Sequence, residues 1–297
     1  MTIYSDMEDR IEPLIAERAP WLYRKRPGTQ LAKRSLHKML GYDKTVDIAK
    51  SLEHATSAQI MDELAARLAQ TVTARGLGNI PAHGPALIVA NHPTGIADGI
   101  ILNHLITKSR PDAYFFANRD ILRVLPQMES MIAAVEWRKE QRSHAKTRET
   151  MAYVRSATKE GRLGVIFPSG RLAKRRGLRL YERPWMASAA MLARKFDLPV
   201  IPVNIQARNS ALFYLFDMIH PTLRDITLFH ETLNKAKQPF RVTVGEPISA
   251  SAIPKGSEDG IEMLRKATLA LGGKDAPTVN LVASSRSLLK SRQKSGV

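Results

Sequence analysis

The sequence predicts an α/β protein whose mixed, largely parallel sheet is flanked by helices and preceded by an N-terminal helical region. Its 297 residues are enough for one large domain, or for one domain with a smaller appendage. From residue 86 onward, short apolar runs alternate with amphipathic segments, as strands joined by helices do. The boundaries that we expect are a helical region 1–80, a main domain 81–272 and a basic, flexible tail 273–297.

The N-terminal region contains two segments, 11–19 and 56–73, that repeat apolar side chains at helical spacing. Between them, Pro20–Gly28 joins two aromatic residues and a leucine to three consecutive cations. Such a segment suits contact with a membrane surface, with the rings at headgroup depth and the cations on lipid phosphates. It equally suits a packed turn between helices with a solvated basic edge, and the sequence leaves both interpretations open.

The main domain alternates apolar runs with helical patterns, which predicts parallel strands with helices on both faces of the sheet. The segment 170–179, which is rich in arginine and glycine, is expected to be a loop. The expected strands are 86–90, 113–117, 135–138, 164–167, 198–205 and 240–244, and the expected helices are 100–106, 144–160, 184–196 and 258–271.

The net charge of +17 predicts an anionic partner, which can be a nucleic acid, an acidic membrane surface or a phosphorylated substrate. The absence of cysteine excludes disulfides, thiolate zinc sites and a cysteine nucleophile. The sequence shows no secretory signal at its N-terminus and no run of 18 apolar residues. If a membrane is involved, we therefore expect the protein to lie on its surface.

The stretch Asn91–Gly99 follows the first buried strand and carries a histidine and an aspartate in a turn rich in proline and glycine. A neutral imidazole at His92 can take a proton from a hydroxyl group, and the Asp98 carboxylate can fix its tautomer. A turn with Asp98 as the cap of the next helix explains the same residues without catalysis. The segment Gly170–Arg179 contains five cations, and its backbone amides near Gly170, with Arg171, could hold a phosphate or an oxyanion, although a solvated basic loop is equally compatible with it.

Four motifs in order resemble the four blocks of the glycerophospholipid acyltransferases that act on lysophosphatidate and similar acceptors. The resemblance spans roughly residues 80 to 250 and is closest to the hemolysin-like branch, which includes lyso-ornithine-lipid acyltransferases. The blocks are Asn91-His92 with Gly95 and Asp98, then Val135–Arg138, then Val165–Gly170, then Val200–Val203. Two further stretches, Arg208–Tyr214 and His220–Arg224, are similar to that branch.

The resemblance implies a role for each matched residue. His92 would be the general base on the acceptor hydroxyl, and Asp98 would orient it. Arg138, with Ser169, Gly170 and Arg171, would bind the acceptor or its phosphate. The supporting motif residues would be Asn91, Gly95, Phe167, Pro168 and Pro202.

This sequence departs from the common family pattern at two places. Five residues instead of four separate His92 from Asp98, a spacing that recurs in the hemolysin-like branch. In the third block, Ser169 stands where the family usually has glutamate and Leu172 where it usually has arginine, with Arg171 as a shifted replacement.

The implied function is transfer of a fatty acyl group from acyl-CoA or acyl-carrier protein to the hydroxyl of a lysolipid such as lysophosphatidate. Glycerol 3-phosphate and lyso-ornithine lipid are alternative acceptors. We expect no cofactor, no metal and no specific nucleic acid, and a bacterial protein in the cytoplasm, held peripherally on the anionic inner face of the membrane. The non-enzymatic alternative is a basic protein that binds nucleic acid or lipid, or a family member without activity that serves as a lipid-binding scaffold.

Overall fold

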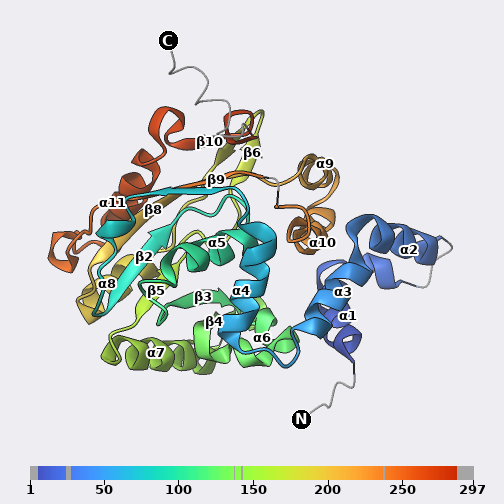
Figure 1. Cartoon of the computed structure of the whole chain (residues 1–297), viewed down its shortest axis with the longest axis horizontal. Coiled ribbons are helices and arrows are strands. Elements are labelled where there is room, and N and C mark those ends of the chain that lie inside the picture. Colours follow the sequence, from blue (N-terminus) through green and yellow to red (C-terminus); the bar gives the residue numbers. More distant parts are fainter. Residues whose placement is uncertain (1–5, 25–27, 137, 142, 237, 286–297) are drawn as a thin grey trace.

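The structure is a computed structural model that describes residues 6–24, 28–136, 138–141, 143–236 and 238–285. Its N-terminal part contains four helices, α1 (Met7–Arg18), α2 (Thr29–Leu40), α3 (Tyr42–Ser51) and α4 (Ser57–Leu68). Figure 1 shows α1, α2 and α3 at one side of the molecule, with α4 packed beside α5 (Ile96–Ile106) of the main domain.

The described residues form a central sheet in the order β1-β9-β8-β2-β5-β3-β4. All neighbouring strands in it are parallel except β8 and β9, which are antiparallel. This confirms the predicted mixed, largely parallel α/β sheet. The strands are β1 (Val72–Arg75), β2 (Ala86–Ala90), β3 (Tyr114–Asn118), β4 (Ile132–Val135), β5 (Leu163–Ile166), β8 (Val200–Gln206) and β9 (Phe240–Val244).

Helices cover both faces of the sheet because the central strands are apolar on both sides (Figure 1). In β2, Ile88 and Ala90 join a core that includes side chains of α4 and α5. Leu87 and Val89 face the opposite core, which side chains of three other helices complete. These are α7 (His144–Lys159), α8 (Ser188–Phe196) and α11 (Ser257–Ala270).

A smaller antiparallel sheet contains β6 (Lys174–Arg176), β7 (Arg179–Tyr181) and β10 (Thr278–Asn280). The prediction of a loop over 170–179 was therefore wrong, because the residues around Gly177 turn back and pair as a hairpin. The expected flexible tail is also wrong at 278–280, which pairs with β7. The rest of that expectation, 286–297, lies outside the described residues. The remaining helices are α6 (Asp120–Val124), α9 (Ala211–Ile219) and α10 (Pro221–Glu231).

Three predicted elements have different bounds in the structure. The helix expected over 56–73 ends at Leu68. The residues after it form β1, whose backbone pairs with β9 at the edge of the sheet. The strand expected over 135–138 lies earlier in the chain, since β4 ends at Val135, and residue 137 is outside the described residues. The helix expected from residue 184 begins only at Ser188, because the Met186 amide donates to the Pro168 carbonyl and holds this segment against the loop after β5.

The aromatic segment Pro20–Tyr23 is a packed turn for most of its length. Leu22 is buried, and the indole of Trp21 donates a hydrogen bond to Thr222 Oγ1 at 3.0 Å. These side chains therefore face the protein, and of the two interpretations the turn between helices holds for them. Residues 25–27, which carry two of the three cations, lie outside the described residues. Among the residues that the structure describes, no helix is long and apolar enough to cross a membrane.

Candidate active site

The candidate site lies at the carboxyl end of β2, where ligands collect in open parallel sheets. The last residues of β2 are fully buried, and Asn91 extends the pairing of β2 with β8 through its side chain. Asn91 Nδ2 donates to the Ile205 carbonyl at 3.0 Å, and the Ile205 amide donates to Asn91 Oδ1 at 2.7 Å. This motif residue therefore fixes the start of the turn that carries His92.

His92 and Asp98 are in direct contact. His92 Nδ1 lies 2.9 Å from Asp98 Oδ2, and the Asp98 side chain is fully buried. The same carboxylate accepts hydrogen bonds from the backbone amides of Thr94 and Gly95 at 2.9 Å each, and from the Thr94 hydroxyl at 2.5 Å. These bonds make the carboxylate an acceptor for Nδ1–H of the imidazole, so that Nε2 of neutral His92 is an acceptor.

The turn between the two residues accommodates the fifth intervening residue. Gly95 has a φ of +93°, a region that residues with a Cβ atom rarely adopt. A Cβ at this position would also lie 3.1 Å from Leu172 Cδ2. Gly95 thus lets the chain reverse tightly, and the first turn of α5 brings Asp98 back to His92.

The loop after β5 packs on this turn. The Phe167 ring stacks on the His92 imidazole with 4.2 Å between ring centroids. The Ala173 amide donates to the His92 carbonyl at 2.9 Å, and Gly170 turns the chain between them with a φ of +58°. The structure therefore places the first and third motif blocks together. In the fourth block, Pro202 lies in β8 beside Val89 of β2 and accepts a hydrogen bond from Gly245 at 2.9 Å.

Ser169 and its neighbours occupy the place of the family's third block. The buried Ser169 hydroxyl donates to the Arg171 carbonyl at 2.8 Å, and the Arg171 side chain is exposed. The Pro168 carbonyl accepts the Met186 amide at 3.0 Å, which draws the segment before α8 against this loop.

Glu182 is a site residue that the sequence analysis missed. It is buried, and its Oε2 accepts the backbone amide of His92 at 3.1 Å while its Oε1 accepts the indole N–H of Trp185 at 3.0 Å. Burial raises the pKa of Glu182, and the hydrogen bonds from the His92 amide and the Trp185 indole only partly oppose this. A signal was present in the sequence, because Glu182 is the only acidic residue between Glu160 and Asp197.

Three arginines concentrate positive charge next to this loop. Arg183 follows Glu182 and donates through Nε to the Leu172 carbonyl at 2.9 Å. Partial burial lowers the pKa of Arg183, and the charges of Arg224 and Arg171 lower it further. Such a group of cations favours an anionic ligand, and Arg183 was not among the predicted site residues.

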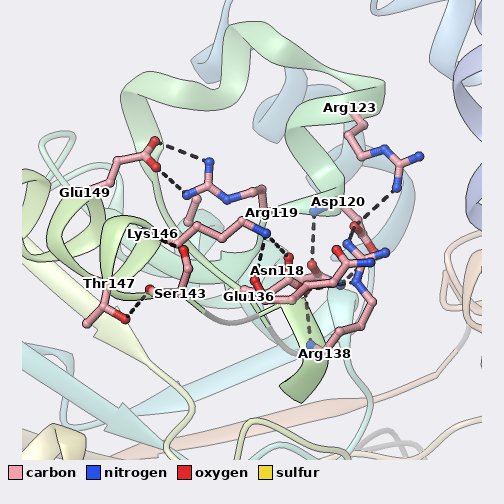
Figure 2. Close-up of polar contacts among 12 residues, drawn as sticks. Asn118, Arg119, Asp120, Arg123, Glu136, Arg138, Ser143, Lys146, Thr147 and Glu149 are labelled. Carbon is pink, nitrogen blue, oxygen red and sulfur yellow. Dashed lines mark hydrogen bonds and ion pairs between the residues drawn. The ribbon is translucent and has the colours of Figure 1, made fainter.

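Arg138 lies at the same edge of the sheet but at the carboxyl end of β4. Because β5 and β3 separate β4 from β2, the strands alone are spaced by roughly 14 Å. Figure 2 shows the cluster around it. Arg138 donates to Glu136 Oε1 at 2.9 Å and to Asp120 Oδ1 at 3.1 Å, and it also pairs with Glu17 of α1. The structure thus holds Arg138 in an ion-pair network, and its binding of the acceptor stays a prediction.

The stretch Arg208–Tyr214, after β8, is anchored by a buried ion pair. Lys235 Nζ lies 2.5 Å from Glu231 Oε2 and 2.7 Å from Asn209 Oδ1, and Ser210 Oγ donates to Glu231 Oε1 at 2.5 Å. Both charged side chains are almost completely buried. These contacts assign a structural role to this stretch, which fixes the start of α9.

Comparison with known proteins agrees with this geometry. Residues 71–206 match the family model described as Acyltransferase. Over 183 residues the chain is 24% identical to the lyso-glycine lipid O-acyltransferase of Phocaeicola vulgatus, covering 60% of this chain and 64% of that one. It is 21% identical to the enzyme of the same name from Bacteroides thetaiotaomicron, covering 60% and 65%. The aligned part is thus less than two thirds of the length of each relative.

Among solved structures, the chain is similar to a 1-acyl-sn-glycerophosphate acyltransferase from Thermotoga maritima. The TM-score is 0.47 at 14% identity, covering 82% of this chain and 96% of that one. The family model spans β2, α5 and β5, and with them His92, Asp98 and the loop after β5. Residues 71–206 are therefore similar to the acyltransferases that this family model describes.

Proposed function

We propose that this protein is an O-acyltransferase that moves a fatty acyl group from an acyl thioester to the hydroxyl of a lysolipid. The observation that carries the proposal is the contact of 2.9 Å between His92 Nδ1 and the fully buried Asp98. A carboxylate held by two backbone amides and a hydroxyl orients the imidazole and stabilises the imidazolium that forms when it takes a proton.

The reaction follows from this arrangement. His92 Nε2 removes the proton of the acceptor hydroxyl as the oxygen attacks the thioester carbonyl carbon. The tetrahedral intermediate then collapses, the carbon–sulfur bond breaks, and the thiolate takes the proton back from His92. The new bond is an ester, so that the acyl group passes directly from donor to acceptor without a covalent enzyme intermediate.

The positive charge around the site suits the substrates of this reaction. Acyl-CoA and acyl-carrier protein are anionic donors, and Arg171 and Arg183 lie in or against the loop after β5. We propose acceptors of the lysophosphatidate, lyso-ornithine and lyso-glycine lipid types, the last because the two curated relatives carry that name. We also propose that the protein acts from the cytoplasm, peripherally on an anionic membrane face.

The test supplies the purified protein with labelled acyl-CoA or acyl-carrier protein and a panel of these lysolipids, with glycerol 3-phosphate added. We expect diacyl product with at least one acceptor, and a fall of about 10²–10⁴-fold in kcat for His92→Ala. The matched control is His83→Ala, which alters an exposed histidine in the loop before β2. No product with any acceptor would refute the function, and full activity of His92→Ala would refute the mechanism.

A further inference from the structure

A groove opens between the β6–β7 hairpin, α9 and the C-terminal turn of the described chain. Its volume is about 450 Å³, and its lining comes from all three segments. The lining includes Leu178 from the hairpin, Leu215 and Met218 from α9, and Val282 from the turn. In Figure 1 the β6–β10 sheet and α9 lie at the same end of the molecule, opposite α7.

The apolar side chains around the groove are exposed to an unusual degree. Leu178 at the hairpin tip is 66% exposed, and Met218 and Ile219 at the end of α9 are 63% and 62% exposed. Leu215 and Val282 are each nearly half exposed. Large apolar residues gathered at one place on a surface mark a contact with another molecule or with a membrane, whereas scattered ones do not.

The charges around these side chains are basic. Arg175 and Arg208 line the groove, and the hairpin adds Lys174, Arg176 and Arg179. In the part of the chain that the structure describes, none of these five cations forms an ion pair with a carboxylate. The acid on α9, Asp217, is paired with Arg224 at 3.1 Å. The groove is therefore bordered by exposed apolar side chains, and the cations around them have no carboxylate partner among the described residues.

This face is directly connected to the candidate active site. The Ala173 amide, one residue before the hairpin, donates to the His92 carbonyl at 2.9 Å. Leu172, one residue earlier, lies against Gly95 of the His92 turn and belongs to the same apolar cluster as Tyr214, which lines the groove. A partner held on this face is therefore brought next to His92.

We propose that the β6–β7 hairpin, α9 and the turn 281–285 form a docking face for an anionic lipid bilayer. Leu178, Met218 and Ile219 enter the headgroup region, and the five cations lie on lipid phosphates. The identity of the partner rests on the proposed function, because a lysolipid acceptor resides in a bilayer. Because Leu22 is buried and the Trp21 indole is bonded to Thr222, we assign the apolar contact to this face rather than to the segment 20–23.

The experiment measures partition of the full chain onto vesicles of phosphatidylcholine alone and of phosphatidylcholine with phosphatidylglycerol. The variants are Leu178→Asp and Met218→Asp. The control is Met191→Asp, which alters an exposed methionine of α8, a helix that lies away from α9 and the hairpin (Figure 1). A further variant, Leu31→Asp, alters the exposed leucine of α2 and tests the N-terminal helices as the alternative contact. Thermal melts verify that each variant is folded.

We expect the wild type to bind vesicles that contain phosphatidylglycerol and not to bind vesicles of phosphatidylcholine alone. Raising the salt concentration should release the bound protein. Leu178→Asp and Met218→Asp should each lower the partition coefficient about tenfold or more, whereas Met191→Asp and Leu31→Asp should leave it near the wild-type value. Wild-type binding by Leu178→Asp and Met218→Asp, or loss of binding only in Leu31→Asp, would overturn the proposal.

Acylation of a dispersed short-chain lysolipid is measured on the same variants and separates this proposal from the proposed function. Retained acylation with lost vesicle binding supports the docking face. Absence of acylation in every variant and in the wild type refutes the enzyme function, while the vesicle measurement still decides whether this face binds lipid.

Discussion

The carboxyl ends of β2 and β4 lie at the same edge of one sheet, yet the structure uses their polar residues in opposite ways. After β2, Asp98 is held by two backbone amides, a hydroxyl and one imidazole. After β4, Arg138 is held by three carboxylates, from Glu136, Asp120 and Glu17, as Figure 2 shows in part. The first arrangement leaves an imidazole nitrogen for substrate, whereas the second compensates its charges internally.

A buried glutamate lies near each strand end, and its pKa shifts in opposite directions at the two ends. Burial by itself would raise the pKa of Glu136, but hydrogen bonds from Arg138 and Lys146 outweigh it and lower the pKa to about 2. Burial raises the pKa of Glu182, whose partners are neutral donors. The comparison indicates that the β4 end is an ion-pair anchor for α1, while the β2 end has the arrangement that the proposed proton transfer needs.

The largest effect is expected from Asp98→Asn. The amide cannot accept from Nδ1–H, the Thr94 hydroxyl and two backbone amides at once, so the imidazole loses its orientation and its tautomer. We expect kcat to fall about 10²–10⁴-fold, measured by acylation of the preferred lysolipid. Asp62→Asn, which alters an exposed aspartate on α4, is the control and should keep wild-type kcat. A wild-type kcat in Asp98→Asn would show that the contact of Asp98 with His92 is not needed for the reaction, and the β2 end would then have no catalytic role that the β4 end lacks.

A smaller effect is expected from Glu182→Ala. It leaves the His92 amide and the Trp185 indole without an acceptor in a buried place, which costs about 1–3 kcal/mol for each unpaired group. If the cost of the unpaired His92 amide alone appears in the transition state, kcat falls roughly 5–150-fold with little change in KM.

Glu182→Gln keeps one carbonyl oxygen and should recover part of that activity, which marks Glu182 as a positioning residue. A purely structural role would instead lower the melting temperature of both variants with unchanged kcat in the folded fraction, and this result would contradict the assignment.

The smallest effect is expected from Glu136→Gln, and it depends on pH. The folded-state pKa of about 2 lies below the ordinary value of 4.5, so the ionised group stabilises the folded state above pH 4.5. This contribution is lost as the pH falls from about 4.5 to about 2. Urea unfolding should therefore show the wild type more stable than Glu136→Gln at neutral pH, and the difference should shrink with acid.

The matched variant is Glu149→Gln, which alters an exposed partner of Arg119 and should change stability by less than about 1 kcal/mol. Glu182→Gln should show the opposite trend with pH. Because the pKa of Glu182 is raised, its contribution is present below its ordinary value of 4.5 and is lost as the pH rises through the higher folded-state value. Parallel pH trends for Glu136→Gln and Glu182→Gln would mean that the two ends do not differ electrostatically.

Local sequence patterns were sufficient to predict the strand and the turn that carry His92 and Asp98. The apolar run 86–90 predicted β2 with its observed bounds, and the proline- and glycine-rich turn after it placed His92 and Asp98 at a strand end. Their contact was predictable from a resemblance, because both residues belong to one turn and one helix start. The alternation of strands and helices also predicted the layers of the main domain.

The partners that come from distant parts of the chain were not predictable in this way. Glu182 reaches His92 across 90 residues because the segment before α8 is drawn against the loop after β5. Arg138 meets Glu17 across 121 residues, because α1 packs beside α6. Periodicity and spacing report which side chains are buried and which residues share a turn. Only the packed chain settles which charges meet, since a buried charge takes whatever partner folding brings within hydrogen-bond reach.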